Sequence, residues 1–130
     1  MVAKPHAAGL TYNQMVVRER RERQVDRVFA ALADPTRRDI VKRVLTQEES
    51  VSALAERYPM SFAAVQKHVA VLERAGLVVK SAHGRERRVR GDVDAIHGAQ
   101  KLLDQLAETW RGRIDRIDEL LAEPTEGDTP

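Results

Sequence analysis

The sequence contains no cysteine, which excludes disulfide bonds, thiolate metal sites and a cysteine nucleophile. It also lacks an apolar run near the ~20 residues of a membrane span, and no apolar signal-peptide segment stands at its N-terminus. A nucleophile elbow and a phosphate-binding glycine loop are absent as well, and we expect no histidine with a carboxylate partner at a cleft. We therefore expect a cytoplasmic protein that is not an enzyme, carries no cofactor and binds no membrane.

Acidic and basic residues nearly balance, because 22 lysines and arginines face 20 aspartates and glutamates in a chain of net charge +2. The balance alone therefore says little about a polyanionic partner. The basic side chains gather in residues 18–23, 37–43 and 80–90, whereas residues 123–130 are acidic. Such segregation predicts a basic face on a nearly neutral molecule, which is the electrostatic pattern of a nucleic-acid-binding protein.

At 130 residues the chain is long enough for one domain with its own core. We expect a flexible N-terminal arm over residues 1–17, a folded domain over residues 18–122 and a disordered acidic tail over residues 123–130. The polar run of residues 18–23 admits two interpretations, a solvated helix with ion pairs between successive turns or an arm that contacts phosphates.

Two helices are predicted in the first part of the domain. Apolar residues at positions i, i+3, i+4 and i+7 indicate a helix that ends near residue 33. Asp34 then caps a second helix, and Pro35 fits its first turn because the N–H that proline lacks would be unpaired there. The side chains expected to face the core are Val25, Val28, Phe29, Leu32, Ile40, Val41, Val44 and Leu45.

A helix-turn-helix follows. A short helix over about residues 52–57, capped by Ser50 or Ser52, leads into a turn at residues 58–60, where a proline disfavours helical geometry. The next helix is capped by Ser61 and stops at Gly76, and it turns an apolar stripe of Val65, Val69 and Leu72 toward the core. Its opposite side carries small residues and basic or amide groups but no carboxylate, so that it can enter a DNA groove; this side comprises Ala63, Gln66, Lys67, Ala70 and Arg74.

Two short strands near residues 77–80 and 87–90, joined by a basic turn with a glycine, predict a wing. A last helix from Asp92 or Asp94 to about Leu121 carries a nearly continuous apolar seam. This helix is longer than the core of so small a domain can cover, so that its natural partner is a second copy of the chain. The predicted fold class is mainly α with a small β-hairpin, a winged helix-turn-helix that dimerises through its last and first helices. The predicted dimer contacts are Val28, Leu32, Leu103, Leu106, Trp110, Ile114 and Ile117.

Two segments of the chain resemble a known family. Residues 29–38, FAALADPTRR, resemble the F-x-A-L-A-D-P-T-R-R opening of the ArsR/SmtB winged-helix repressors, and residues 61–78 resemble the S-x-x-A-V-S-K-H-L-x-V-L-x-x-A-G-L-V recognition segment of that family. Gln66 departs from the usual serine, and residues 88–90 replace a more usual aromatic. The resemblance implies a homodimer that represses by occupying an operator. The metal-sensing motifs of the family are broken, because neither Asp94 nor His97 begins a complete ligand set, and we expect no metal site.

Double-stranded DNA is the partner that this resemblance and the acid-free helix face predict. Gln66 and Lys67 are the expected base readers, because an amide can bond adenine bidentately and lysine can reach guanine. The wing arginines are expected at phosphates or in the minor groove, while Arg37 and Arg38 either contact the DNA backbone or pair internally. The predicted DNA-binding residues are Arg37, Arg38, Ser61, Phe62, Ala63, Gln66, Lys67, Ala70, Arg74, Arg85, Arg87 and Arg88.

Other interpretations stay open. His68 is expected to be structural or to bond a phosphate, with a ligand or pH-sensing role as the alternative. The same fold could also belong to a sensor, with a metal at His97 or an unidentified small molecule between the first and last helices as its effector. A winged-helix dimer used only for protein–protein contact is a further alternative, although such a module has no need for an acid-free helix beside an arginine-rich hairpin.

Overall fold

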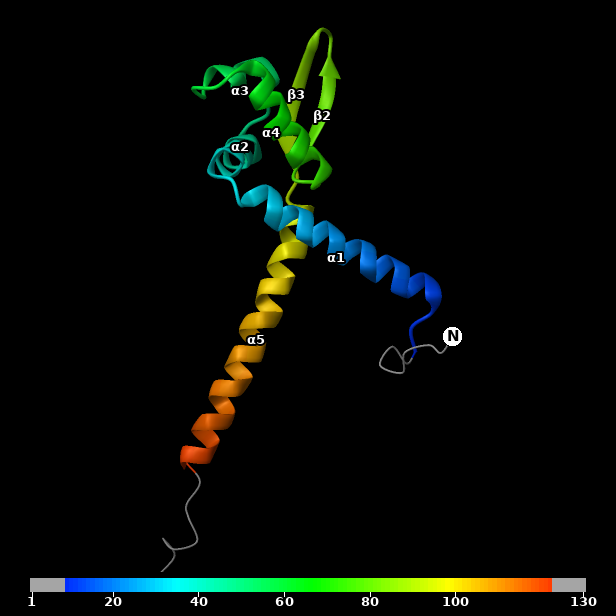
Figure 1. Ribbon diagram of the computed structural model, residues 1–130, viewed down its shortest axis with the longest axis vertical. Coiled ribbons are helices and arrows are strands. Elements are labelled where there is room, and N and C mark those ends of the chain that lie inside the picture. Colours follow the sequence, from blue (N-terminus) through cyan, green and yellow to red (C-terminus); the bar gives the residue numbers. More distant parts are fainter. Residues whose placement is uncertain (1–8, 123–130) are drawn as a thin grey trace, which may run out of the picture. The chain divides into compact units, whose positions relative to one another are not determined.

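The computed structural model describes residues 9–122, and the chain divides into two compact units, residues 1–99 and residues 100–130. The helices and strands follow one another from the blue to the red end of the ribbon in Figure 1. In chain order they are α1 (Tyr12–Leu32), α2 (Pro35–Thr46), β1 (Glu49–Ser50), α3 (Val51–Glu56), α4 (Phe62–Arg74), β2 (Val78–His83), β3 (Glu86–Gly91) and α5 (Asp94–Ala122). The predicted fold class, mainly helical with a small sheet, is confirmed.

The first helix begins earlier than predicted. The hydroxyl of Thr11 accepts a hydrogen bond from the backbone N–H of Gln14 (3.1 Å), and the Gln14 amide oxygen accepts one from the backbone N–H of Thr11 (2.7 Å). This capping box starts α1 at Tyr12, so that the flexible arm predicted over residues 1–17 is wrong for residues 12–17; residues 1–8 lie outside the described part of the chain. Near its other end α1 buries Val28 completely, whereas Phe29, one helical step further round, stays 37% exposed and is not the core residue that the spacing predicted.

The core of the first unit lies between α2, α3, α4 and the sheet. Its fully or almost fully buried members include Ile40, Val44, Leu54, Val65, Val69, Leu72, Leu77, Val78 and Val89. Leu45 was predicted to face this core but is 44% exposed. It lies instead against the backbone of Gly91, where an added Cβ atom would come within 2.6 Å of Leu45 Cδ2. Leu45 therefore covers the end of β3 from outside the core.

The sheet has three antiparallel strands in the order β1-β3-β2. The predicted hairpin is present and longer than expected, since Val78 to His83 pair with Gly91 to Glu86. Its turn consists of Gly84 and Arg85, and Gly84 has φ +64°, which suits the first central position of a tight hairpin turn. Strand β1, in a segment predicted to be a simple connection, pairs Glu49 with Val89 and Ser50 with Arg88. The wing is thereby tied to the start of α3, whose N-terminus Ser50 caps.

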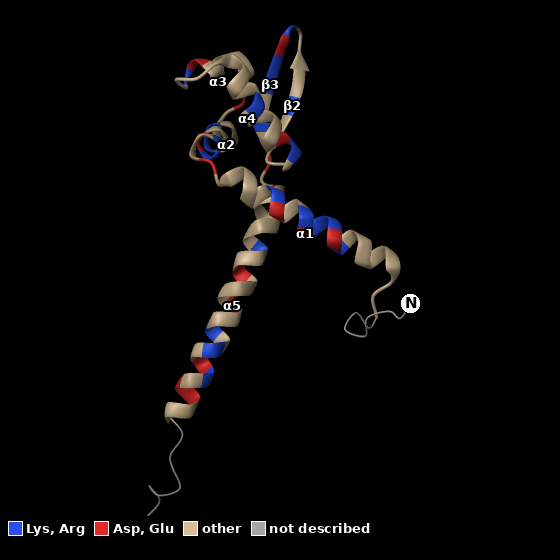
Figure 2. Cartoon of the chain, viewed as in Figure 1, with Lys and Arg blue, Asp and Glu red and all other residues tan. Residues whose placement is uncertain are grey.

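Helix α5 begins at Asp94, whose backbone N–H donates to Asp92 Oδ1 (3.0 Å). Its first turns belong to the first unit, where Ala99 is buried and Ile96 packs against the core. From residue 100 onward α5 forms a unit of its own, and residues of both charge signs occur along it (Figure 2). The apolar seam predicted for dimer contact is exposed there, at Leu103 (53%), Leu106 (60%), Trp110 (58%), Ile114 (37%) and Ile117 (43%).

One predicted dimer contact is wrong. The side chain of Val28 is 0% exposed within a single chain, because it belongs to the core that α1 shares with the other helices of the first unit. It therefore has no surface to offer a second copy. Leu32, the other dimer contact predicted on α1, is half-buried against the same core.

Candidate DNA-binding surface

Helix α4 is fixed at both ends and along one side, as its sequence predicts. The hydroxyl of Ser61 accepts a hydrogen bond from the backbone N–H of Ala64 (3.1 Å), and Gly76 leaves the helix with φ +76°. Val65, Val69 and Leu72 are at most 1% exposed. At the C-terminal end the amide of Gln24 in α1 donates to the carbonyl oxygen of Ala75, which adds a polar contact between the two helices. The opposite face of α4 is thereby presented outward.

That outward face carries the predicted base-reading residues. Gln66 and Lys67 are exposed, as are Ser61, Ala63 and Arg74, while Ala70 is half-buried; Phe62 in the first turn is 47% exposed. The carboxylate of α4 belongs to Glu73, which lies outside this face and pairs with Lys80 of β2 (Glu73 Oε1 to Lys80 Nζ, 3.5 Å). The face is therefore free of negative charge and open to solvent.

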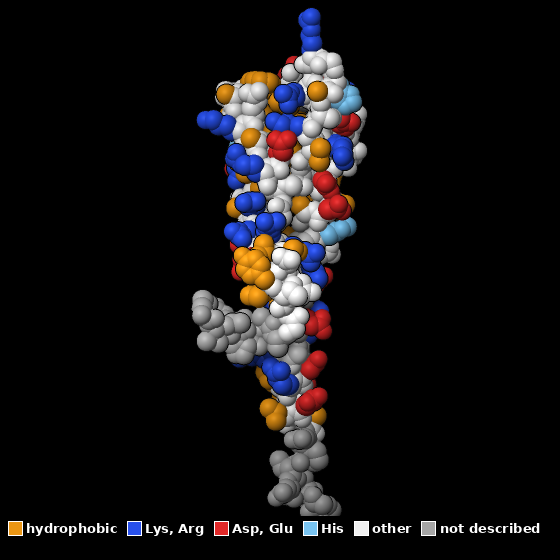
Figure 3. Space-filling model, turned by 90° about the vertical axis from the view of Figure 1, so that its right-hand side faces the viewer, with side chains coloured by type: hydrophobic (Ala, Val, Ile, Leu, Met, Phe, Trp, Pro, Cys, Tyr) orange, Lys and Arg blue, Asp and Glu red, His pale blue; other side chains and the backbone are white. Residues whose placement is uncertain are grey.

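The wing places two of its three predicted arginines in solvent. Arg85 at the turn and Arg87 on β3 are exposed, and Figure 3 shows a basic side chain standing at the tip of the hairpin. Arg88 points differently: its Nε lies 3.7 Å from Glu48 Oε1 and its Nη1 lies 3.7 Å from Glu86 Oε2. Arg88 is thus engaged within the chain, and it contributes less free positive charge than the sequence suggested.

A groove of about 370 Å³ lies between α4 and the wing. Its walls bring together residues far apart in the sequence: Ser50, Val51, Ser52, Phe62, Gln66, Val69, Lys80, Arg85, Glu86 and Arg87. Gln66 from α4 and Arg85 and Arg87 from the wing therefore border one continuous surface. Lys80, also on this surface, was not among the predicted DNA-binding residues, because its place next to α4 depends on the register of the hairpin rather than on the local sequence.

Arg37 and Arg38 are used inside the chain, which agrees with the second of their two predicted roles. Arg37 Nε donates to the carbonyl oxygen of Ala31 (2.7 Å) and Arg37 Nη2 to that of Ala30 (3.2 Å), while Arg38 Nη1 donates to that of Leu32 (2.7 Å). Both guanidinium groups thus bond carbonyl oxygens of the last turn of α1, and among these the oxygen of Ala30 also accepts from the backbone N–H of Ala33 (3.3 Å). These two arginines join α2 to α1 instead of projecting as free cations.

His68 lies within the same cluster, in agreement with the expected structural role. Its Nδ1 is 3.4 Å from Arg37 Nη1 and 4.0 Å from Asp34 Oδ2. The backbone N–H of Arg37 donates to Asp34 Oδ2 (2.9 Å), and this hydrogen bond is the main reason why the pKa of Asp34 is lowered. The cap of α2 and the inner side of α4 are therefore held together by polar contacts.

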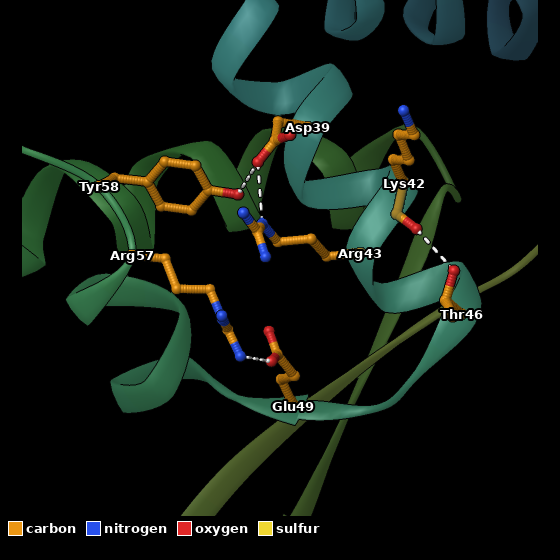
Figure 4. Close-up of polar contacts among 7 residues, drawn as sticks. All are labelled: Asp39, Lys42, Arg43, Thr46, Glu49, Arg57 and Tyr58. Carbon is orange, nitrogen blue, oxygen red and sulfur yellow. Dashed lines mark hydrogen bonds and ion pairs between the residues drawn. The ribbon is translucent and has the colours of Figure 1, made fainter.

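A second polar cluster braces the turn before α4, and sequence reasoning did not find it. The Tyr58 hydroxyl donates to Asp39 Oδ2 (2.6 Å), and Arg43 Nε donates to the same oxygen (2.9 Å) (Figure 4). The guanidinium of Arg43 also lies 6.0 Å from the centre of the Tyr58 ring. Burial and the hydrogen bond to Asp39 raise the pKa of Tyr58 to about 12, and the same hydrogen bond is the main cause of a lowered pKa at Asp39.

The brace connects α2 to the turn that leads into α4. Figure 4 shows Tyr58 reaching from this turn to Asp39 and Arg43 on α2, with Arg57 and Glu49 paired below them (Arg57 Nη2 to Glu49 Oε1, 2.5 Å). The i, i+4 spacing of Asp39 and Arg43 on a helix was a visible signal, but their partner Tyr58 could be identified only from the tertiary structure.

Within residues 9–122 the structure contains no cluster of three or more histidine, aspartate or glutamate side chains that could hold a metal ion. In the same part of the chain no helix combines the length and apolar character that crossing a bilayer requires.

Comparison with known proteins identifies the family to which this chain belongs. The model of a helix-turn-helix domain family matches residues 32–80. The HTH-type transcriptional regulator Rv2034 of Mycobacterium tuberculosis is 37% identical over 83 residues, which cover 64% of this chain and 78% of that protein. The ArsR-like transcriptional regulator from Rhodococcus sp. RHA1 has a TM-score of 0.68 and 33% identity, covering 80% of this chain and 97% of that one.

A more distant structure shares the fold. The homodimeric winged helix-turn-helix DNA-binding domain of a Mycobacterium bovis protein has a TM-score of 0.56 at 24% identity, and the match covers 77% of this chain and 89% of that one. The proteins to which this chain is similar are regulators of transcription and not enzymes. Together with the two sequence segments and the winged helix-turn-helix seen in the structure, these matches show that the chain belongs to the ArsR family of transcriptional regulators.

Proposed function

We propose that this protein is a homodimeric repressor that binds an inverted-repeat operator in double-stranded DNA. The observation that carries this proposal is the outward face of α4, which is exposed, free of carboxylates and bordered by the arginines of the wing. An α-helix fits the major groove of B-DNA, and hydrogen-bonding side chains on its outer face can read base edges there. Repression follows if the occupied operator overlaps a promoter.

We assign the residues of this surface to three kinds of DNA contact. Gln66 and Lys67 read bases, Gln66 by a bidentate contact to adenine and Lys67 by a bond to guanine. The N-terminal end of α4, with Ser61, Phe62 and Ala63, approaches a phosphate or a thymine methyl group. Arg74, Arg85 and Arg87 supply contacts to the DNA backbone or the minor groove, because they are exposed and cationic. Lys80 joins them as an additional phosphate contact on the same groove.

The dimer rests on the exposed seam of α5. Five large apolar side chains between 37% and 60% exposed on one helix predict a partner that covers them, and a second copy of the chain is the simplest partner. The homodimeric state of the Mycobacterium bovis domain is consistent with this. In such a dimer the two α4 helices would lie one turn of DNA apart, about 34–36 Å. Residues 12–122 would then form the DNA-binding and dimerisation domain.

Selection of bound duplexes from a random DNA pool tests the proposal. We expect recovered sequences to contain an inverted repeat with half-sites about 10 base pairs apart, centre to centre. Recovery of sequences without a repeat would contradict a symmetric dimer, and failure to enrich any duplex would contradict DNA binding.

A salt titration with a matched pair of variants identifies the surface. Lys67→Ala is expected to lower the slope of log affinity against log salt by about 2 for the dimer, because each of the two half-sites loses one cation that stands in the groove beside the phosphates. Lys101→Ala removes an exposed lysine of α5 that is not among the residues of the proposed surface, and it should leave the slope unchanged. Equal effects of the two variants would indicate a general charge effect and would argue against the assignment of α4.

A further inference from the structure

A second groove, distinct from the one beside the wing, lies between the C-terminal parts of α1 and α4 and the start of α2. It measures about 400 Å³ and is lined by Arg27, Ala30, Ala31, Arg37, Val71, Arg74 and Ala75. Figure 1 shows α1 passing the C-terminal end of α4 at this place. The four apolar lining residues are all small. Ala30 and Ala31 belong to the C-terminal part of α1, and Val71 and Ala75 to the C-terminal end of α4, so that the two helices leave a hollow between them.

The rim of this groove is positively charged. Arg27 and Arg74 are exposed, and their guanidinium groups form no ion pair or hydrogen bond with any other residue of the described part of the chain. Glu73, next to Arg74 in the sequence, pairs instead with Lys80 (3.5 Å), and Asp26, next to Arg27, forms no ion pair with it. Arg37 is held in place by its bonds to the carbonyl oxygens of Ala30 and Ala31. The groove thus combines an apolar floor with two uncompensated cations and a third that is fixed in position.

We propose that this groove binds an amphiphilic organic acid, a molecule with one carboxylate and an apolar body of about six to ten carbon atoms. Arginine binds carboxylates through two parallel hydrogen bonds, and Arg27 and Arg74 stand where a carboxylate at the rim would meet them. The apolar body would cover Ala30 and Val71, since Ala31 and Ala75 are at most 1% exposed. The volume falls in the range of small-molecule sites, about 300–1,000 Å³. A bare phosphate would satisfy the arginines but would leave the apolar floor uncovered, which is why a carboxylic acid with a hydrocarbon part fits better.

Occupation of the groove would also affect DNA binding, and this part of the inference rests on the proposed function. Arg74 borders the groove and also belongs to the outward face of α4. A carboxylate that pairs with Arg74 withdraws one cation from the DNA, so that the ligand and the operator compete for it. By linkage, the acid weakens DNA binding by the same factor by which DNA weakens binding of the acid.

Nuclear magnetic resonance titration of the full chain without DNA tests the site itself. Octanoate is the probe, acetate carries the same charge without the apolar body, and octanol and octylammonium carry the body without the negative charge. We expect octanoate to shift backbone amide signals of Ala30, Val71 and Ala75 with a dissociation constant of roughly 1 mM, as suits a small ligand on an open groove. The other three probes should leave these signals in place. Equal shifts with octylammonium, or no shifts with octanoate, would overturn the proposal.

Two variants and one control locate the binding site. Arg27→Glu reverses a rim charge and should weaken octanoate binding roughly tenfold or more, because a charge-assisted pair is replaced by repulsion. Ala30→Leu fills the floor without changing charge and should also weaken it. Arg20→Glu makes the same charge change on α1 outside the groove and should have no effect. Unchanged binding in both groove variants would refute the site even if octanoate binds elsewhere.

The effect on DNA is measured separately with duplexes recovered from the random pool. Octanoate should lower the affinity of the unmodified protein for DNA several-fold and leave that of Arg27→Glu unchanged. Groove binding without an effect on DNA affinity would overturn the coupling between the two sites. A protein that binds no duplex at all would contradict the proposed function and would leave the titration without DNA as an independent result.

Discussion

Replacing Tyr58 with phenylalanine tests whether the brace between α2 and the turn before α4 stabilises the fold. The change removes the hydroxyl that donates to Asp39 Oδ2 at 2.6 Å and leaves the ring and the bond from Arg43 in place. The pKa of Tyr58 is raised from 10.0 to about 12, and at 1.36 kcal/mol per pKa unit this shift limits the preference of the folded chain for the neutral hydroxyl to at most about 2.7 kcal/mol. Burial of the ring is the largest cause of that shift, and the hydrogen bond to Asp39 comes second.

The hydrogen bond therefore accounts for only part of this bound, and solvent that reaches the half-buried Tyr58 reduces it further. We expect Tyr58→Phe to lower the free energy of unfolding by about 1–2 kcal/mol, in line with hydrogen bonds to charged groups. For a domain of this size the loss corresponds to a melting temperature lower by roughly 4–10 °C. Chemical denaturation at neutral pH measures the free energy. Tyr12→Phe is the matched control, because Tyr12 is 80% exposed and should tolerate the same change.

The dependence on pH supplies a second readout. The pKa of Tyr58 is higher in the folded chain than in the unfolded one, so its stabilising contribution is complete below pH 10 and is lost as the pH rises from 10 to 12. The difference in stability between wild type and Tyr58→Phe should accordingly be constant below about pH 9 and shrink above pH 10. Since the chain has two tyrosines, ultraviolet titration of Tyr12→Phe reports Tyr58 alone. Equal stability of Tyr58→Phe and wild type, or a Tyr58 pKa near 10, would refute the brace.

Three further predictions concern the ends of α4 and α1 and the seam of α5. Gly76→Ala should cost about 1–2 kcal/mol in denaturation experiments, because Gly76 has φ +76° and an added Cβ would lie 2.8 Å from Gln24 Nε2, whereas Gly112→Ala, with open space around it, should not destabilise the fold. Arg37→Ala should lower the free energy of unfolding by about 1–2 kcal/mol, because the carbonyl oxygen of Ala31 loses its side-chain donor and that of Ala30 keeps only the backbone N–H of Ala33, and a smaller loss than for the more exposed Arg38→Ala would contradict that role. Trp110→Ala should weaken self-association by about 2 kcal/mol or more in analytical ultracentrifugation, with Glu108→Ala as control, and an unchanged dimer would exclude Trp110 from the interface.

Local sequence signals predicted those parts of the fold that local chemistry determines. Ser61, Asp34 and Gly76 act at helix ends as expected, because capping depends on residues within one turn. The buried stripe of Val65, Val69 and Leu72 followed from helical spacing. The start of α1 was also readable in principle, since Thr11 and Gln14 have the spacing of a capping box.

Features that depend on tertiary packing could not be predicted in this way. Strand β1 exists because the segment before α3 meets β3, and a two-residue strand leaves no periodic signal. Leu45 has the spacing of a core residue but lies against Gly91 at the edge of the sheet. Val28 was predicted to be both a core residue and a dimer contact. Its complete burial within one chain shows that it is a core residue.

The same division applies to the candidate site. Gln66 and Lys67 were identified from the helix face alone, because the side of α4 opposite its apolar stripe must face outward. The roles of the arginines depended on neighbours distant in sequence. Arg88 meets Glu48 across the sheet and Arg37 meets the end of α1, whereas Arg85 and Arg87 stay in solvent. Lys80 lies on this surface because of the register in which β2 pairs with β3.

The central claim is that the outward face of α4 reads bases, and base preferences of a Gln66→Ala variant test it most directly. Duplex selection with wild type and variant side by side should show that the variant loses its preference at one position in each half-site, where discrimination falls by about 1–3 kcal/mol, and keeps all the others. The same preferences in both proteins, at every position, would contradict the placement of α4 in the DNA groove.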